Sequence, residues 1–182
     1  MIPAPFQVIL DANILFPFTL RDTLLRAAER ELYLIGWSRQ ILEEMRRNLV
    51  STGHTTEEKS HTLVSHMRAA FPEAEITGYE FLIPTMPNDE RDRHIAAAAV
   101  KSGAQLIVTS NMKHFRTLPE GVEAKTPGDF LLDLQDLAPG MMAQAIIAQA
   151  AALKRPPRTV EDVLRALEKF APEFVKLVRS DL

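Results

Sequence analysis

The chain has 182 residues, of which 46% are hydrophobic and 25% charged, and its 21 basic and 24 acidic residues give a formal net charge of −3. This balance is ordinary for a globular protein, and it excludes an overall basic field of the kind that attracts nucleic acid to a whole domain. The absence of cysteine excludes a disulfide framework and a thiolate metal site, and it fits the reducing cytoplasm, where we expect the protein to be located.

Short apolar runs alternate with helical patterns over the first 137 residues. "QVIL", residues 7–10, is short and apolar, which is typical of a buried strand, and residues 20–31 then repeat apolar side chains on one helical face. Ser38 is a predicted helix N-cap, and "IPTMPND", residues 83–89, is a predicted loop. The predicted strands are residues 7–10, 32–37, 74–79, 104–110 and 122–127, and the predicted helices are residues 20–31, 39–50, 56–71, 90–103 and 126–137. This order predicts an α/β fold with a mostly parallel sheet.

The C-terminal part of the chain reads as helical only. The uncharged run at residues 137–153 contains Pro139, Gly140 and two glutamines, so it is too short and too polar to span a membrane. Beyond "KRPPRT", residues 154–159, one or two amphipathic helices are predicted. We therefore expect an α/β domain over residues 1–136 and a C-terminal helical extension over residues 137–182, packed on it.

Polar side chains follow two of the predicted strands. Asp11 and Asn13 come directly after the strand at residues 7–10, and "TSN", residues 109–111, follows "QLIV". Ligands of parallel α/β sheets bind at the carboxyl ends of the strands, so these residues are candidates for a binding site. The alternative for Asp11 is an ordinary helix cap or Asx turn.

A second acidic cluster opens the predicted helix at residues 90–103. Asp89 and Asp92 are three residues apart and share a helical face, although one of them, Asp89, is also a candidate cap. Clustered carboxylates repel one another unless a cation neutralises them. Oxygen ligands without cysteine favour a hard cation, so Asp11, Asp92, Asn111 and an acid from "ILEEMRRNL" predict a site for Mg²⁺ or Mn²⁺.

Four segments together resemble the PIN-domain ribonucleases, in particular those of bacterial VapC-like toxins. They are "VILDANILFP", "SRQILEEMRRNL", "DERDRHIAAAAVKSGAQLIVTSNMKHF" and "TPGDFLLDL". The resemblance covers residues 6 to 135 and implies a three-layer α/β/α sandwich whose acids hold one or two Mg²⁺ or Mn²⁺ ions for RNA hydrolysis. It also implies an RNA substrate and an antitoxin partner.

The motif residues of the family fall on particular positions of this chain. The resemblance implies that Asp11, Glu44 and Asp92 are the catalytic and metal-binding acids, with Asp89 as an alternative acid. Glu43 is the rival of Glu44, and periodicity does not separate them. The family often has Asp at the fourth position, where this chain has Asn111, and this departure argues against a second metal ion.

Other polar residues complete the predicted site. Asn13, Thr109 and Ser110 are expected to orient metal ligands or water, with ordinary loop hydrogen bonding as the alternative. Arg46, Arg93 and Lys113 are candidate RNA contacts, although surface charges of this kind are commonly only solvated.

Two other functions and one structural question stay open at the sequence level. An aspartyl-phosphate phosphohydrolase also places an acid after its first strand, but its second acid is replaced here by Asn13. The other alternative is a catalytically weak or inactive PIN-like module that binds RNA or protein. The amphipathic faces beyond residue 159 either pack on the parent domain, receive an antitoxin segment or build a homodimer.

Overall fold

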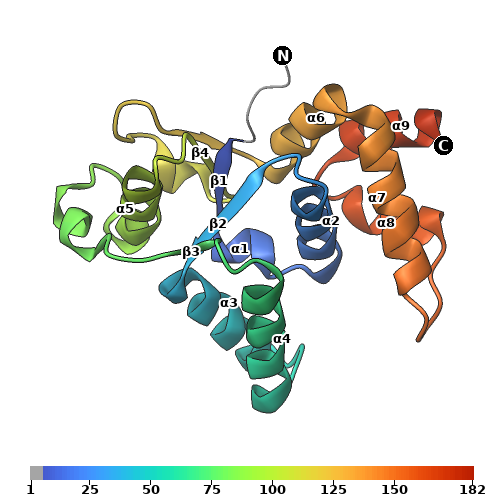
Figure 1. Cartoon of the computed structure of the whole chain (residues 1–182), viewed down its shortest axis with the longest axis horizontal. Coiled ribbons are helices and arrows are strands. Elements are labelled where there is room, and N and C mark those ends of the chain that lie inside the picture. The colour runs from blue at the N-terminus through green and yellow to red at the C-terminus, as the bar shows by residue number, and fades with distance from the viewer. Residues whose placement is uncertain (1–5) are drawn as a thin grey trace. The chain divides into compact units, whose positions relative to one another are not determined.

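A five-stranded parallel sheet is the centre of the α/β part of the chain (Figure 1). The structure is a computed structural model that describes residues 6–182. The strands lie in the order β3-β2-β1-β4-β5, and all four pairings are parallel, so the predicted α/β class with a mostly parallel sheet is confirmed. The strands are β1 (Gln7–Leu10), β2 (Leu34–Ser38), β3 (Glu75–Ile76), β4 (Leu106–Val108) and β5 (Glu123–Lys125).

The strand order reverses at β1, because β2 lies on one side of it and β4 on the other. Leu10, the last residue of β1, is paired with Val108, the last residue of β4. The residues that follow, Asp11 and Thr109, therefore leave the sheet side by side at the point where parallel α/β folds bind their ligands.

Residues grouped by their contacts form two units. The first contains the residues up to Phe16 together with Leu34–Lys125, and it includes the whole sheet; the second contains Pro17–Tyr33 and Thr126–Leu182. This grouping differs from a linear division of the chain at residues 136 and 137, which stays a prediction.

The helices of the first unit pack on both faces of its sheet. In the strand order, the connection from β2 to β3 leads toward the β3 edge of the sheet, whereas the connection from β3 to β4 leads back toward the β5 edge. Because such connections are right-handed, they place α3 and α5 on opposite faces and give three layers. The helices are α1 (Ala12–Leu15), α3 (Arg39–Ser51), α4 (Glu57–Ala70) and α5 (Arg93–Ser102), with 3₁₀ turns η1 (Glu80–Thr85), η2 (Glu90–Asp92) and η3 (Met112–Phe115).

Local sequence signals explain where several of these helices begin and end. The Ser38 hydroxyl accepts a hydrogen bond from the backbone N–H of Ile41 and caps α3, as predicted. Thr56 caps α4 in the same way. α5 ends at Gly103, which adopts a left-handed conformation with φ of 73° that glycine accommodates without steric cost.

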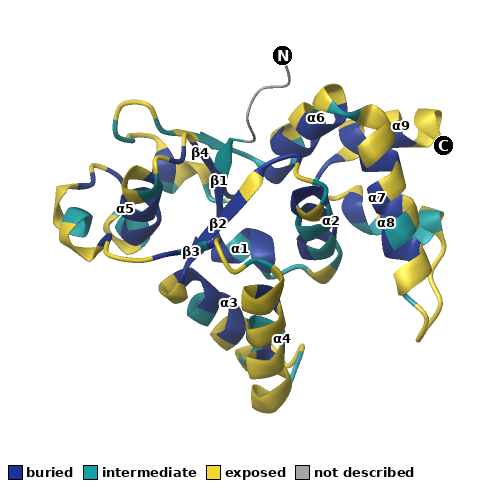
Figure 2. Cartoon of the chain, in the orientation of Figure 1, coloured by how far each residue is buried: buried dark blue, intermediate teal, exposed yellow. Residues whose placement is uncertain are grey.

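The core of the first unit explains the apolar runs of the sequence (Figure 2). Val8, Ile9 and Leu10 of β1 are fully buried, as is Ile107 of β4. α5 contributes four consecutive buried alanines, residues 96–99, and contacts the four strands β1 to β4. Small side chains let the helix backbone approach the sheet closely, so α5 holds its first turn near the strand ends.

The second unit is built from helices. They are α2 (Phe18–Glu29), α6 (Pro127–Leu137), α7 (Pro139–Ala152), α8 (Val160–Leu167) and α9 (Pro172–Asp181). α7 contacts the other four, and the apolar faces predicted beyond residue 159 are turned inward within this unit. The buried members of those faces are Val163, Leu164, Leu167, Phe174, Val175 and Val178.

The structure corrects several details of the sequence reading. Part of the predicted loop at residues 83–89 belongs to η1, which contains Pro84, because a 3₁₀ turn tolerates a missing backbone donor better than a long helix does. The predicted helix 90–103 begins as η2 and becomes α5 only at Arg93. Within residues 6–182, no helix is long and apolar enough to cross a membrane.

Candidate active site

Asp11 is the first residue after β1, and the end of the sheet holds its backbone in place. Its N–H donates to the carbonyl of Val108, 3.1 Å away, which continues the ladder between β1 and β4. The residue is only 5% exposed. Its Oδ2 atom accepts hydrogen bonds from Asn13 Nδ2 at 2.6 Å and from Thr109 Oγ1 at 2.7 Å. Asp11 is the N-cap residue of α1 but makes no side-chain capping hydrogen bond, and its carboxylate is held by Asn13 and Thr109.

Asn13 and the residues after β4 form a polar bridge across the two strand ends. Asn13 Nδ2 lies 3.2 Å from Thr109 Oγ1, and its Oδ1 accepts from the N–H of Ser110 at 3.0 Å. Thr109 Oγ1 accepts in turn from the N–H of Asn111 at 3.0 Å. Asn13 and Thr109 therefore enter through their side chains, whereas Ser110 enters through its backbone.

Asp92 lies at the end of η2, directly before α5, and faces the same cluster. His114 Nδ1, on η3, lies 2.7 Å from Asp92 Oδ2, so a protonated Nδ1 donates to this carboxylate. Asn111 Nδ2 lies 3.5 Å from the same oxygen and 2.6 Å from His114 Nδ1. Asp92, Asn111 and His114 thus form one contact group that continues into the bridge from Thr109.

The environment of Asp11 disfavours its charged form. Burial raises the pKa of the Asp11 carboxyl, the hydrogen bond from the Thr109 hydroxyl lowers it, and the charge of Asp92 raises it again. The net pKa lies above the ordinary value for aspartate. The two carboxylates are therefore close enough to repel one another. A cation beside them would offset both this repulsion and the cost of burying the Asp11 charge.

Glu44 approaches from α3 and meets a histidine rather than the two aspartates. Its Oε1 atom lies 3.2 Å from Nε2 of the buried His94, on α5. Burial raises the pKa of Glu44, but the contacts with His94, Gln40 and Arg47 outweigh burial, and the net pKa is lower than usual. Glu44 is therefore a charged carboxylate at neutral pH.

The neighbouring Glu43 points to a different part of α3. Its carboxylate accepts two hydrogen bonds from Arg46, at 2.7 and 2.9 Å, and Arg47 lies 3.7 Å away. The hydrogen bonds from Arg46 lower the pKa of Glu43. Of the two adjacent glutamates, Glu44 is the one that contacts α5, the helix that begins beside Asp92.

The structure gives three of the predicted residues local contacts. The Asp89 carboxylate accepts from the N–H of Arg91, so it caps η2, as its alternative reading proposed. Arg46 is buried and pairs with Glu43 and Glu57. Its guanidinium is therefore engaged within the protein, which argues against a contact with RNA. Arg93 Nε donates to the carbonyl of Asn88 at 3.2 Å.

The donor set suits a hard divalent cation. The converging groups are carboxylate, amide and hydroxyl oxygens, which Mg²⁺ and Mn²⁺ prefer. Within the described residues, no group of three or more His, Cys, Asp or Glu side chains is arranged to hold a metal ion, and Glu44 as a metal ligand stays a prediction. Mg²⁺ is commonly held by one or two carboxylates together with water and substrate phosphates, and Asp11 and Asp92 meet that requirement.

The contacts of His114 and His94 with the acids were missed at the sequence level. Neither contact was among the predictions made from the sequence. The available signal for His114 was its spacing from Asn111, because residues three apart in a 3₁₀ turn lie on the same side. No comparable signal connects His94 with Glu44, which is 50 residues earlier in the chain.

The chain is similar to known families over most of its length. A PIN-domain family model matches residues 7–113, and a model described as the VapC50 C-terminal domain matches residues 127–180. A protein of Mycobacterium tuberculosis (strain ATCC 25618 / H37Rv) named "Putative ribonuclease VapC50" is 40% identical over 105 residues, which cover 56% of this chain. The match spans 62% of that relative, less than two thirds of its length. No solved structure matches the chain.

Proposed function

The chain belongs to the PIN-domain family. We propose that it is a Mg²⁺- or Mn²⁺-dependent endoribonuclease. The observation that carries the proposal is the pair of repelling carboxylates, Asp11 and Asp92, beside the point where the strand order reverses. A buried carboxylate with a raised pKa is costly to a fold, and it is found most often where chemistry needs it. The name of the M. tuberculosis relative points to the same class of activity.

Asp11 and Asp92 would hold the cation. A divalent ion there would stabilise the negative charge that develops on the scissile phosphate and make a bound water more acidic. Asn13 and Thr109 hold the Asp11 carboxylate through Oδ2. His114 does the same for Asp92, whose Oδ2 it contacts at 2.7 Å. Hydrogen bonds of this kind fix the direction of a carboxylate before a cation or substrate arrives.

We propose that Glu44 accepts a proton from the attacking water. It is ionised at neutral pH and half-buried, although its lowered pKa makes it a weaker base than an ordinary glutamate. The Nε2 atom of His94 lies 3.2 Å from this carboxylate, so a protonated His94 would pair with it. Arg93 and Lys113 are close in sequence to Asp92 and His114, and we propose that they contact the RNA backbone.

We also propose that the protein is the toxin of a toxin–antitoxin pair. The match of residues 127–180 to the VapC50 C-terminal domain and the 40% identity to the VapC50 relative over 105 residues support this proposal. The apolar faces of α8 and α9 are buried within the second unit, so an antitoxin would have to use other surfaces. A homodimer stays a prediction.

One observation favours a second candidate, a PIN-like binding module with weak or no catalysis. Asn111 replaces an acid, and both Asn111 and His114 lie against Asp92, so the carboxylate has neutral or basic partners without a cation. The aspartyl-phosphate reaction gains no support, because Asn13 hydrogen-bonds to Asp11 instead of supplying a second acid.

An RNA cleavage assay separates these candidates. We expect wild-type protein to cleave single-stranded RNA with Mg²⁺ or Mn²⁺, to lose activity in EDTA, and to regain it when metal is restored. Asp11→Asn should be inactive under all three conditions. Metal-independent cleavage, or equal cleavage by Asp11→Asn, would refute the proposed function, and RNA binding without cleavage would favour the binding module.

A further inference from the structure

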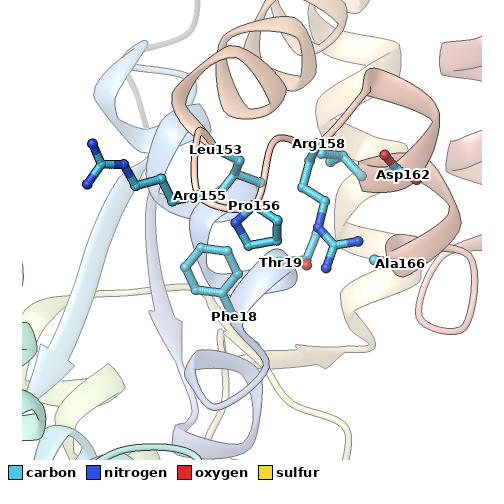
Figure 3. Close-up of a pocket in the computed structure, with 9 residues that line it drawn as sticks. Phe18, Thr19, Leu153, Arg155, Pro156, Arg158, Asp162 and Ala166 are labelled. Atoms are coloured by element: carbon cyan, nitrogen blue, oxygen red, sulfur yellow. The ribbon is translucent and has the colours of Figure 1, made fainter.

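A pocket of about 350 Å³ lies in the second unit and is lined only by residues of that unit (Figure 3). Its volume lies within the range of small-molecule sites. The wall combines an aromatic ring with a cation: Phe18 and Thr19 come from the start of α2, and Pro156 and Arg158 come from the turn between α7 and α8. Apolar and charged groups thus meet in one cavity, although they come from segments far apart in the sequence.

The Phe18 ring is exposed and held in place. The residue is 53% exposed, which is unusual for a phenylalanine that lines a pocket. The guanidinium of the buried Arg21, one helical turn later, lies over the ring, 5.6 Å from its centre. This cation–π contact orients the ring, whose remaining surface is open to a flat partner. In Figure 3 the Pro156 ring lies next to it, which extends the apolar surface.

Arg158 supplies positive charge to the pocket. It belongs to the exposed turn "KRPPR", in which Lys154 and Pro157 form an isolated β-bridge and the N–H of Arg158 donates to the carbonyl of Leu153. In Figure 3 the Arg158 side chain extends toward Thr19, whereas the Arg155 guanidinium points away from the other labelled side chains. The backbone contacts hold the turn that carries Arg158.

Asp162 is the acid that lines the pocket, and its carboxylate is held by Thr159. The Oδ2 atom of Asp162 accepts hydrogen bonds from the N–H of Thr159 at 2.8 Å and from its hydroxyl at 2.9 Å, which closes the capping box of α8. Within residues 6–182, Arg155 and Arg158 make no ion pair at salt-bridge distance. The hydrogen bonds from Thr159 lower the pKa of Asp162, and the charge of Arg158 lowers it as well, so the two groups interact without an ion pair, and the guanidinium can still bind an anion from solution.

We infer that this pocket binds one nucleotide of single-stranded RNA, with the base against Phe18 and a phosphate on Arg158. The choice of RNA as the nucleic acid rests on the proposed function. Aromatic stacking together with arginine contacts to phosphate is the usual combination in proteins that bind single strands. An acidic peptide would contact Arg158 but would not stack on the exposed ring of Phe18. A nucleotide would contact both residues, so it explains the pocket better.

The inference is tested by titrating the full-length protein with adenosine 5′-monophosphate in EDTA, with adenosine and inorganic phosphate as separate probes. EDTA removes metal-mediated phosphate binding at Asp11 and Asp92. We expect the mononucleotide to bind more tightly than either part. Phe18→Ala and Arg158→Gln should each weaken it by at least about fivefold, because stacking of one base contributes an effect of this size or larger. Phe18→Tyr should retain binding.

Matched controls in the same unit show whether the effect belongs to the pocket. Ile147→Ala also removes a large apolar side chain, which is 48% exposed, and Lys176→Gln also removes one exposed positive charge. Neither residue lines the pocket, so both variants should bind like wild type. Melting temperatures identify a variant that has lost binding because it is unfolded. If Phe18→Ala is unfolded, the nucleotide affinity of Phe18→Tyr tests the role of the aromatic ring.

Three results would overturn the inference. They are unchanged affinity in both pocket variants, phosphate binding as tight as nucleotide binding, and a glutamate-rich peptide that displaces the nucleotide with higher affinity. RNA cleavage by the same variants keeps the two proposals separate. If wild type cleaves RNA but the pocket variants bind the nucleotide like wild type, only the nucleotide site is refuted. If wild type does not cleave RNA but the pocket variants lose nucleotide binding, only the ribonuclease proposal is refuted.

Discussion

His114 Nδ1 lies 2.7 Å from Asp92 Oδ2. The contact joins η3, which follows β4, to the residue that precedes α5, so it fixes the distance between two walls of the candidate site. A histidine that donates to a metal-binding carboxylate sets the direction of the remaining carboxylate oxygen. We therefore treat His114 as a positioning residue for Asp92.

The first prediction tests this relationship. His114→Ala should lower Mn²⁺ affinity and the rate of RNA cleavage by about 10–100-fold, the usual effect of losing a group that orients a metal ligand. Isothermal titration and a cleavage assay measure the two effects. The matched control is His66→Ala on the exposed surface of α4, which should behave like wild type. Equal metal affinity in His114→Ala and wild type would show that Asp92 needs no such support.

The second prediction separates two adjacent glutamates. Glu44→Gln should abolish cleavage without unfolding the protein, because Glu44 is the acid that contacts α5. Glu43→Gln should remain active and lose at most about 1 kcal/mol of stability, since its partly exposed pair with Arg46 contributes little. Cleavage rates and melting curves of the two variants give the comparison. Loss of activity in Glu43→Gln alone would mean that the other face of α3 serves the reaction.

The third prediction concerns pH. The pKa of Asp11 is raised in the folded protein, so the folded state binds its proton more strongly than the unfolded state does. The free energy of unfolding therefore falls as pH rises from the ordinary aspartate pKa through the raised one. In EDTA, Asp11→Asn removes this penalty and should melt at a higher temperature than wild type at pH 7 but not at pH 3.

Metal addition should reverse that ranking. Mn²⁺ binds only the folded state and should raise the melting temperature of wild type but not that of Asp11→Asn. Scanning calorimetry at both pH values, with EDTA and with Mn²⁺, checks the two parts together. A wild-type protein that is more stable than Asp11→Asn in EDTA at pH 7 would contradict the electrostatic account of Asp11.

The fourth prediction compares two glycines of the second unit. A Cβ added to Gly128 in α6 would lie 2.7 Å from the backbone carbonyl oxygen of Phe170, whereas one added to Gly140 in α7 would meet nothing within 4 Å. Gly128→Ala should cost about 1–3 kcal/mol, because backbone atoms cannot move aside easily. Gly140→Ala should be neutral or slightly stabilising. Denaturant unfolding measures both variants, and equal stability would show that the loop before α9 is not held against α6.

The positions that follow strands could be predicted from the sequence, because local pattern determines them. The apolar run at residues 8–10 ends at Asp11, and the run at residues 106–108 ends at Thr109; parallel pairing then brings Asp11 and Thr109 together. The choice between Glu43 and Glu44 could not be made from periodicity, since the apolar stripe of the helix lies between them. It depends on the contact with His94, which only tertiary packing creates.

Long-range packing also decides the composition of the second unit. The N-terminal α2 contacts α7 and α8, and no local signal in residues 18–29 indicates partners more than 100 residues away. The buried pair of Thr23 Oγ1 and Gln149 Oε1, 2.7 Å apart, is one such contact. The exposed Phe18 at the start of the same helix lines a pocket together with the turn before α8, which no local signal indicates.

The central claim is that Asp11 and Asp92 together hold one divalent cation, and Mn²⁺ titration by calorimetry tests it most directly. Wild type should bind one Mn²⁺, and Asp11→Asn and Asp92→Asn should each weaken the affinity by more than about tenfold. Asp89→Asn, which removes an acid that caps η2, should bind like wild type. Equal Mn²⁺ binding by wild type and Asp11→Asn would contradict the claim.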